Sequence, residues 1–130
     1  MDYNELLNHL QVVGKDPSRL IFEDELTGLY NRRFLYNYFQ QNIPWNALED
    51  NPLSLLMMDL DYFKTINDSY GHDVGDQALV WLANLLREAS GDKYLPIRYA
   101  GDEFMILMPL SRKKTAVNLA EKVIALSHEK

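Results

Sequence analysis

The sequence predicts one α+β domain, and three observations support this prediction. The chain has 130 residues, of which 47% are apolar and 25% are charged, as in an ordinary globular domain. Segments with apolar residues at helical spacing alternate with short, continuous apolar runs that are typical of strands. A glycine-containing turn separates two of these runs, which indicates a hairpin and therefore a sheet rich in antiparallel pairs.

Two helices are expected before the first strand. Apolar residues recur at helical spacing over residues 2–13, which predicts an amphipathic lead-in helix, with a linker completing residues 1–19. A second helix is predicted within residues 27–39, because Thr27 can cap it and apolar or aromatic residues then recur on one face. This helix should end before Pro44.

The central part of the chain should form the sheet and one covering helix. The apolar run Leu53–Met58 suits a strand that is buried on both faces. A helix is expected over Asp76–Ala89, closed by Gly91. The hairpin strands are expected at Leu95–Tyr99 and Phe104–Met108.

The last element should be a helix over residues 112–128, for which Ser111 is a candidate cap. Its inward stripe is expected to consist of small and aliphatic side chains, namely Ala116, Leu119, Ala120, Val123 and Ile124. Residues 20–130 are therefore expected to form one domain after the lead-in segment.

Composition narrows the classes of function. The chain has no cysteine, which excludes disulfides, thiolate metal sites and cysteine nucleophiles. Its net charge of -6 argues against a nucleic-acid partner, because non-specific affinity for phosphate backbones comes from clustered Lys and Arg. The longest apolar run is much shorter than the roughly 20 residues of a membrane-spanning helix, so a cytoplasmic location is expected.

Two acidic turns are the first candidate site. Asp59 and Asp61 stand where the buried strand runs out, and Asp102 and Glu103 stand in the hairpin turn. If the strands are neighbours, both turns meet at one edge of the sheet, where carboxylates and substrate phosphates could share a magnesium ion. Either pair alone could also be ordinary surface decoration of a turn, and spacing does not decide between these readings.

The segment between the two acidic turns offers groups for a nucleotide. Lys64 could meet a phosphate as a point positive charge. The amide of Asn67 and the carboxylate of Asp76 suit the donors and acceptors of guanine, although Asp76 could instead be a helix N-cap. His72 is expected to be a turn or packing residue, because no second histidine lies at metal-ligand spacing.

With these residues in place, the chain resembles the GGDEF domain of bacterial diguanylate cyclases. Five blocks in family order carry the resemblance over about residues 20–128: Asp24–Arg33 (DELTGLYNRR), Asp59–Lys64 (DLDYFK), Ile66–His72 (INDSYGH), Gly75–Asp76, and Arg98–Phe104 (RYAGDEF). The resemblance implies a ferredoxin-like palm similar to that of nucleotidyl cyclases. It also implies a bacterial signalling transferase that condenses two GTP into cyclic di-GMP with Mg²⁺ or Mn²⁺ across a homodimer.

The resemblance assigns roles to individual residues. The metal ligands would be Asp59, the Leu60 carbonyl, Asp102 and Glu103, and the catalytic set would be Asp59, Asp102 and Glu103. The groups that bind GTP would be Phe63 and Lys64 at the phosphates, Asn67 and Asp76 at guanine, and Gly101 beside the ribose and phosphates.

The sequence departs from the family pattern in three places. Ala100 replaces the first glycine, which gives an AGDEF variant, and Gly91–Tyr94 replaces the Arg-x-x-Asp of the feedback site. The strand, hairpin and helix that normally follow the last helix are expected to be missing from the palm, so the Leu53–Leu60 strand should have an open edge. We expect a partner strand or dimer to cover this edge, and an upstream sensor or further C-terminal domain in the natural protein. The alternative to a cyclase is a degenerate, truncated GGDEF-like module for nucleotide binding, dimerisation or signal relay without turnover.

Overall fold

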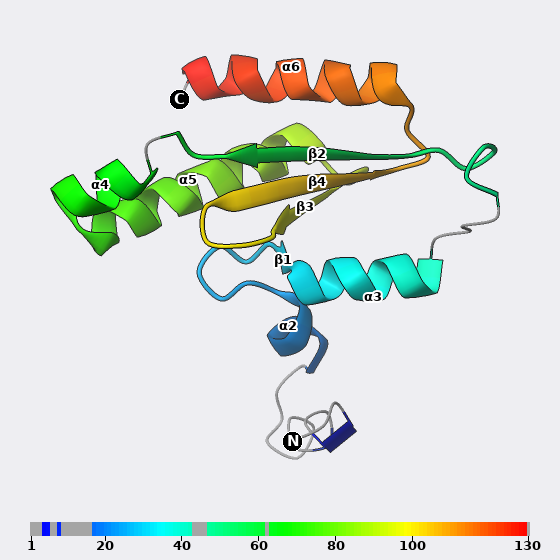
Figure 1. The fold of residues 1–130 in the computed structure, drawn as a ribbon, viewed down its shortest axis with the longest axis horizontal. Helices are drawn as coiled ribbons and strands as arrows, with labels where there is room; N and C mark the ends of the chain where they lie inside the picture. Colours follow the sequence, from blue (N-terminus) through cyan, green and yellow to red (C-terminus); the bar gives the residue numbers. More distant parts are fainter. Residues whose placement is uncertain (1–3, 6–7, 9–16, 43–46, 62, 130) are drawn as a thin grey trace.

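The computed structural model describes residues 4–5, 8, 17–42, 47–61 and 63–129. Within these residues a four-stranded sheet lies between helices on its two faces (Figure 1). The elements are α2 (Pro17–Phe22), β1 (Tyr30–Asn31), α3 (Arg32–Asn42), β2 (Leu53–Asp59), α4 (Phe63–Tyr70), α5 (His72–Ser90), β3 (Leu95–Arg98), β4 (Glu103–Pro109) and α6 (Lys113–Glu129).

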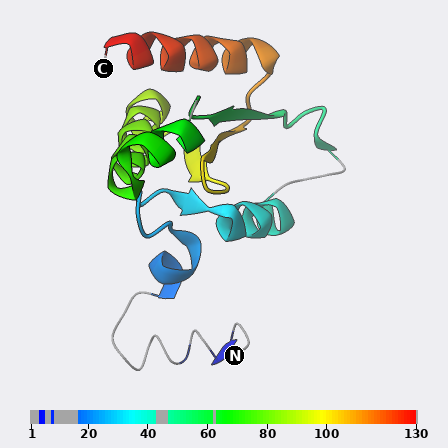
Figure 2. The same ribbon diagram turned by 60° about the vertical axis from the view of Figure 1, so that its left-hand side comes forward.

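The strand order is β1-β3-β4-β2, with β1 parallel to β3 and the other neighbours antiparallel. Helices α5 and α6 cover one face of the sheet, whereas α3 lies across the other face (Figure 2). The predicted hairpin is confirmed as β3 and β4, and β4 is the central strand. All five residues from Phe104 to Met108 are buried, because helices lie on both sides of this strand.

Strand β2 differs from its prediction. It has one neighbouring strand among the described residues, so it lies at the edge of the sheet, as the expected open edge requires. It is not buried on both faces: the side chains of Leu55 and Met57 are 39% and 66% exposed. Helix α3 packs against β1 and β3 and leaves this part of β2 uncovered. The expectation that a partner strand covers the edge stays a prediction.

The predicted helix over residues 27–39 starts too early. Helix α3 begins at Arg32, because the Asn31 side chain caps it by accepting a hydrogen bond from the Phe34 amide at 3.0 Å. Thr27 belongs instead to a turn in which Gly28 has φ of +74°. Helix α2 and strand β1 were not expected, and most of the predicted lead-in helix lies outside the described residues.

The segment between β2 and β3 is more helical than the sequence suggested. The sequence predicts no helix where α4 lies, and α5 begins at His72 rather than at Asp76. Gly71 joins the two helices with φ of +89°, a conformation that costs glycine little. Asp76 is therefore the fifth residue of α5, and the N-cap reading of this residue is wrong.

The last helix is confirmed, with a narrower inward face than predicted. Ala116 and Leu119 are buried and Val123 packs against the core, but Ile124 is 58% exposed. The hydroxyl of Ser111 donates to the Pro109 carbonyl, so this side chain secures the turn before α6 rather than the helix itself.

Two isoleucines allow a matched test of the core. Ile106 is fully buried at the middle of β4, so Ile106→Val should lower the free energy of unfolding by about 0.5–1.5 kcal/mol. The same substitution at exposed Ile124 should change it by less than about 0.5 kcal/mol. Urea denaturation of both variants measures the difference, and equal effects would contradict the burial of these two side chains.

Candidate functional site

The two acidic turns meet at one end of the sheet, as the sequence predicted. In the antiparallel register of β2 and β4, Asp59 lies directly opposite Glu103. Residues opposite each other on antiparallel strands point to the same face, with Cβ atoms about 4.5–5.5 Å apart. Asp102 precedes Glu103 in the turn between β3 and β4. The register thus brings together acidic residues that are more than 40 positions apart in the sequence.

This pairing carries an electrostatic cost. Like charges on opposite strand positions are destabilising, and both Asp59 and Glu103 are exposed. No Lys or Arg among the described residues forms an ion pair with either carboxylate; the described ion pairs are Arg19–Glu23 and Arg98–Asp24. A cation bound between the strands would remove this repulsion.

The carboxylates do not form a ready-made cluster. In the described part of the chain, no group of three or more His, Asp or Glu side chains is placed to hold a metal ion. Asp102 lies in the turn before β4, so the register of the two strands does not place its side chain beside Asp59. The arrangement offers Mg²⁺ one or two carboxylates at a time, which suffices where substrate phosphates supply the remaining oxygens.

Three predicted site residues lie just beyond β2. The Leu60 carbonyl accepts a hydrogen bond from the Phe63 amide at 3.3 Å, and one of its two lone pairs remains for a ligand. The Phe63 ring packs against the core, so its side chain is structural. Lys64 is exposed on the first turn of α4 and can reach an anion in solution.

Asn67 and Asp76 are placed on two helices that pack together, α4 and α5. The Asn67 Oδ1 atom is buried and has no hydrogen-bond partner among the described residues. A buried amide oxygen without a partner is costly. Gly75 explains how Asn67 fits, because a Cβ on Gly75 would lie 1.7 Å from Oδ1. Asp76 follows directly and is exposed.

The hairpin turn accommodates the alanine that replaces the first family glycine. The Ala100 amide donates to the Glu103 carbonyl and the Glu103 amide donates to the Ala100 carbonyl, both at 3.2 Å. Ala100 does not have a positive φ, so its methyl group adds no backbone strain. A Cβ on Gly101 would have no atom of the described residues within 4 Å, so these residues leave open space beside the turn.

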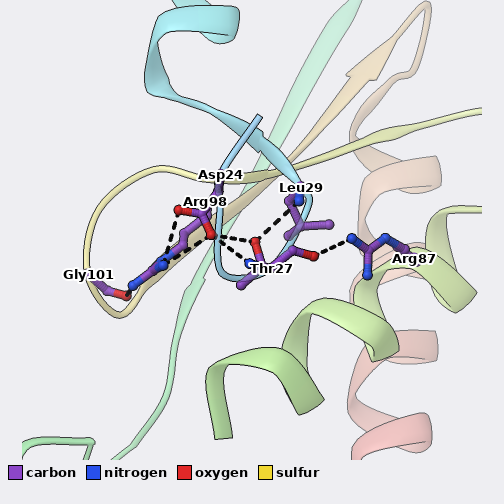
Figure 3. Close-up of polar contacts among 6 residues, drawn as sticks. All are labelled: Asp24, Thr27, Leu29, Arg87, Arg98 and Gly101. Atoms are coloured by element: carbon purple, nitrogen blue, oxygen red, sulfur yellow. Dashed lines mark hydrogen bonds and ion pairs between the residues drawn. The ribbon is translucent and has the colours of Figure 1, made fainter. Parts of the chain in front are cut away.

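A clamp that sequence reasoning missed holds this hairpin. Arg98 forms an ion pair with Asp24 at 3.1 Å and donates to the Gly101 carbonyl at 3.0 and 3.2 Å (Figure 3). Asp24 in turn accepts hydrogen bonds from the amide and hydroxyl of Thr27, and the Thr27 carbonyl accepts one from Arg87. The charged and polar residues of this clamp can be seen in the sequence, but residues that contact each other are up to 74 positions apart.

The contribution of Asp24 in this clamp to stability should depend on pH in the acid range. Burial raises the pKa of the Asp24 carboxyl, but the Thr27 hydrogen bonds and the Arg98 charge outweigh burial and hold this pKa below its ordinary value. A lowered folded-state pKa stabilises the fold above the unfolded value of about 4, and this stabilisation is lost as the pH falls through the folded value.

We expect Asp24→Asn to lower stability at pH 7 by about 1–3 kcal/mol, because the charged partner of Arg98 is lost. Melting temperatures measured from pH 7 to pH 3 should therefore converge for wild type and variant at the acid end. Parallel curves would show that Asp24 does not titrate with folding.

Comparison with known proteins assigns most of the chain to one family. The family described as "Diguanylate cyclase, GGDEF domain" matches residues 21–129. The response regulator PleD of Caulobacter vibrioides is 41% identical over 106 residues, which cover 80% of this chain and 23% of PleD. The chain therefore spans about a quarter of that relative.

Solved structures agree with this match. A diguanylate cyclase SiaD from Pseudomonas aeruginosa, in complex with its activator SiaC, aligns with a TM-score of 0.74 and 31% identity over 95% of this chain and 46% of SiaD. The GGDEF domain of DgcB from Caulobacter crescentus, in complex with c-di-GMP, aligns with a TM-score of 0.72 and 25% identity. This alignment covers 78% of this chain and 60% of the DgcB chain. The predicted palm fold is thus confirmed. None of the described helices is long and apolar enough to cross a membrane.

Proposed function

The chain belongs to the GGDEF domain family of diguanylate cyclases, and on this basis we propose that it binds GTP with a divalent cation and condenses two GTP molecules into cyclic di-GMP. The observation that carries the proposal is the register of β2 and β4. It sets Asp59 opposite Glu103, with no cation among the described side chains to neutralise them. Two facing carboxylates destabilise an ordinary surface turn, whereas a site for a metal-bound triphosphate needs such carboxylates as metal ligands.

The proposed metal site consists of hard oxygen ligands, namely Asp59, the Leu60 carbonyl, Asp102 and Glu103. Such ligands fit Mg²⁺ or Mn²⁺. When bound, the metal acts as a Lewis acid on the phosphate oxygens and lowers the pKa of the attacking hydroxyl. Because the described carboxylates do not form a cluster of three, we expect metal binding to depend strongly on the nucleotide.

The proposed guanine contacts lie on the helix pair. The Asn67 amide nitrogen would donate to the guanine carbonyl oxygen, and Asp76 would accept from the guanine ring N–H and amino group. Lys64 would meet the phosphates as a point charge, and the backbone near Phe63 would lie beside them. The open space at Gly101 would admit the ribose and phosphates against the hairpin.

The reaction requires two domains. In each, the residues above hold one GTP, so that the 3′-hydroxyl oxygen of one nucleotide attacks the α-phosphorus of the other and pyrophosphate leaves. Asp102 would help to take the hydroxyl proton. The main work of the protein is positioning, because a two-fold pair of sites turns an encounter between two nucleotides into a reaction between prearranged groups.

We propose the same division of the chain as the sequence indicated, with a lead-in over residues 1–19 and the GGDEF domain over residues 20–130. Relatives such as PleD are about four times longer than the aligned region, so an upstream sensor or further C-terminal domain would complete the natural protein. A partner strand or a second copy would pair with the open edge of β2.

Incubation with GTP and Mg²⁺, followed by chromatography, tests the proposal. We expect cyclic di-GMP, and none when EDTA is added before GTP. The alternative is a nucleotide-binding or dimerisation module without turnover, which the absence of a described three-carboxylate cluster favours. GTP binding without product would support a nucleotide-binding module. The absence of both product and a GTP-dependent thermal shift would overturn the cyclase and leave a dimerisation or signal-relay module.

A further inference from the structure

A cavity of about 620 Å³ lies behind the hairpin, on the α3 side of the sheet. Its walls come from α2, the start of α3 and the β3–β4 turn. The residues that matter for its chemistry are Asp24, Arg32, Arg33, Arg98 and the aromatic pair Tyr36 and Tyr99. None of the proposed metal ligands or guanine contacts lines it, and Gly101 is the one residue of the proposed GTP site on its wall.

The cavity is positively charged in an acidic protein. Arg98 and Asp24 neutralise each other in the clamp shown in Figure 3. Arg33 makes no hydrogen bond or ion pair with the described residues. Arg32 donates from Nε to the Tyr99 carbonyl at 3.2 Å and lies 4.8 Å above the Tyr99 ring. That contact fixes the guanidinium and leaves its Nη groups available. Two positive charges therefore remain, in a chain whose net charge is -6.

The remaining lining is apolar and neutral. Leu20 is 52% exposed and Tyr36 is 50% exposed at the rim, so both can contact a ligand body. The Tyr36 and Tyr99 hydroxyls are hydrogen-bonded at 2.9 Å, and this bond raises the pKa of Tyr99, which keeps the phenol uncharged. The lining thus combines an anion-binding end with an aromatic and aliphatic surface.

We propose that this cavity binds a small phosphomonoester, of the size of a mononucleotide, with its phosphate between Arg32 and Arg33 and its body against Leu20 and Tyr36. Both guanidinium groups line the cavity and can donate to the oxygens of a phosphate, and two positive charges match a dianion. The volume lies within the range of small-molecule sites and exceeds the need of a bare phosphate ion. An occupant would also touch Ala100 and Gly101, the hairpin turn that precedes Asp102 and Glu103.

Adenosine 5′-monophosphate is a suitable probe, because it carries a phosphomonoester and lacks guanine. Titration calorimetry in EDTA removes any binding through a metal, so the result does not depend on the proposed cyclase site. We expect saturable binding to wild type and competition by inorganic phosphate. Adenosine should bind at least about tenfold more weakly than the monophosphate, because it lacks the charge-assisted hydrogen bonds.

Arg33→Ala is the decisive variant, since Arg33 has no described partner and its loss should leave the fold intact. This substitution should lower the affinity for adenosine 5′-monophosphate by about tenfold or more. Lys114→Ala removes one positive charge from exposed α6, far from the cavity lining, and should bind as wild type. Unchanged affinity in Arg33→Ala, equal binding of adenosine, or no saturable binding would each overturn the proposal.

Discussion

Asp59→Asn should lower the formation of cyclic di-GMP by at least about 100-fold, the scale of losing a group that stabilises charge in a transition state. Asparagine keeps the size of the side chain and removes its charge, which weakens the proposed metal site directly. The same change relieves the repulsion from Glu103 on the opposite strand, so stability should stay unchanged or rise by about 0.2–1 kcal/mol. Turnover and stability are thus expected to change in opposite directions.

Asp61→Asn is the matched control for this prediction. It removes the same charge two residues further on, beyond the last residue of β2, where no strand residue lies opposite. Its product formation should stay within a few-fold of wild type. Chromatography of the products and urea denaturation of both variants give the two readouts. Equal losses of activity at Asp59 and Asp61 would show that the register has no special role.

The sequence predicted the sheet well because its signal is local. Strands β2, β3 and β4 begin within one residue of their predicted positions, since continuous apolar runs are strong strand signals. Helix α4 was missed because Phe63–Tyr70 is short and mostly polar, although Phe63, Ile66 and Tyr70 recur at helical spacing. Strand β1 has two residues and exists only through its pairing with β3, which no local pattern reveals.

The sequence predicted which residues form the candidate site and that its two acidic turns meet. It did not predict the contacts that hold the site in place. The convergence of Asp59 and Glu103 followed from the expectation that their strands are neighbours. The ion pair of Asp24 and Arg98 could not be predicted, because the two residues are 74 positions apart and the order of the strands, with β1 beside β3, brings them together. The sequence predicted no structural role for Gly75, whereas in the structure its missing side chain makes room for Asn67.

Gly75→Ala should therefore weaken GTP binding by about tenfold while the protein remains folded. A Cβ at this position would lie 1.7 Å from Asn67 Oδ1 and 2.9 Å from its Cγ, so the Asn67 side chain must move. Displacement removes the proposed Asn67 contact to guanine, and the loss of one or two hydrogen bonds corresponds to about one to two kcal/mol. Calorimetry with a non-hydrolysable GTP analogue and Mg²⁺ measures the change.

The stability of the same variant separates a functional glycine from a structural one. Alanine inside α5 gains up to about 1 kcal/mol in helix propensity, and moving Asn67 costs little because its Oδ1 has no described partner to lose. Asn67→Ala should lower the affinity for the analogue as much as Gly75→Ala does. The double variant should bind the analogue as tightly as either single variant, since both substitutions act through one side chain. Additive losses would mean that Gly75 contributes to the site by a route other than the placement of Asn67.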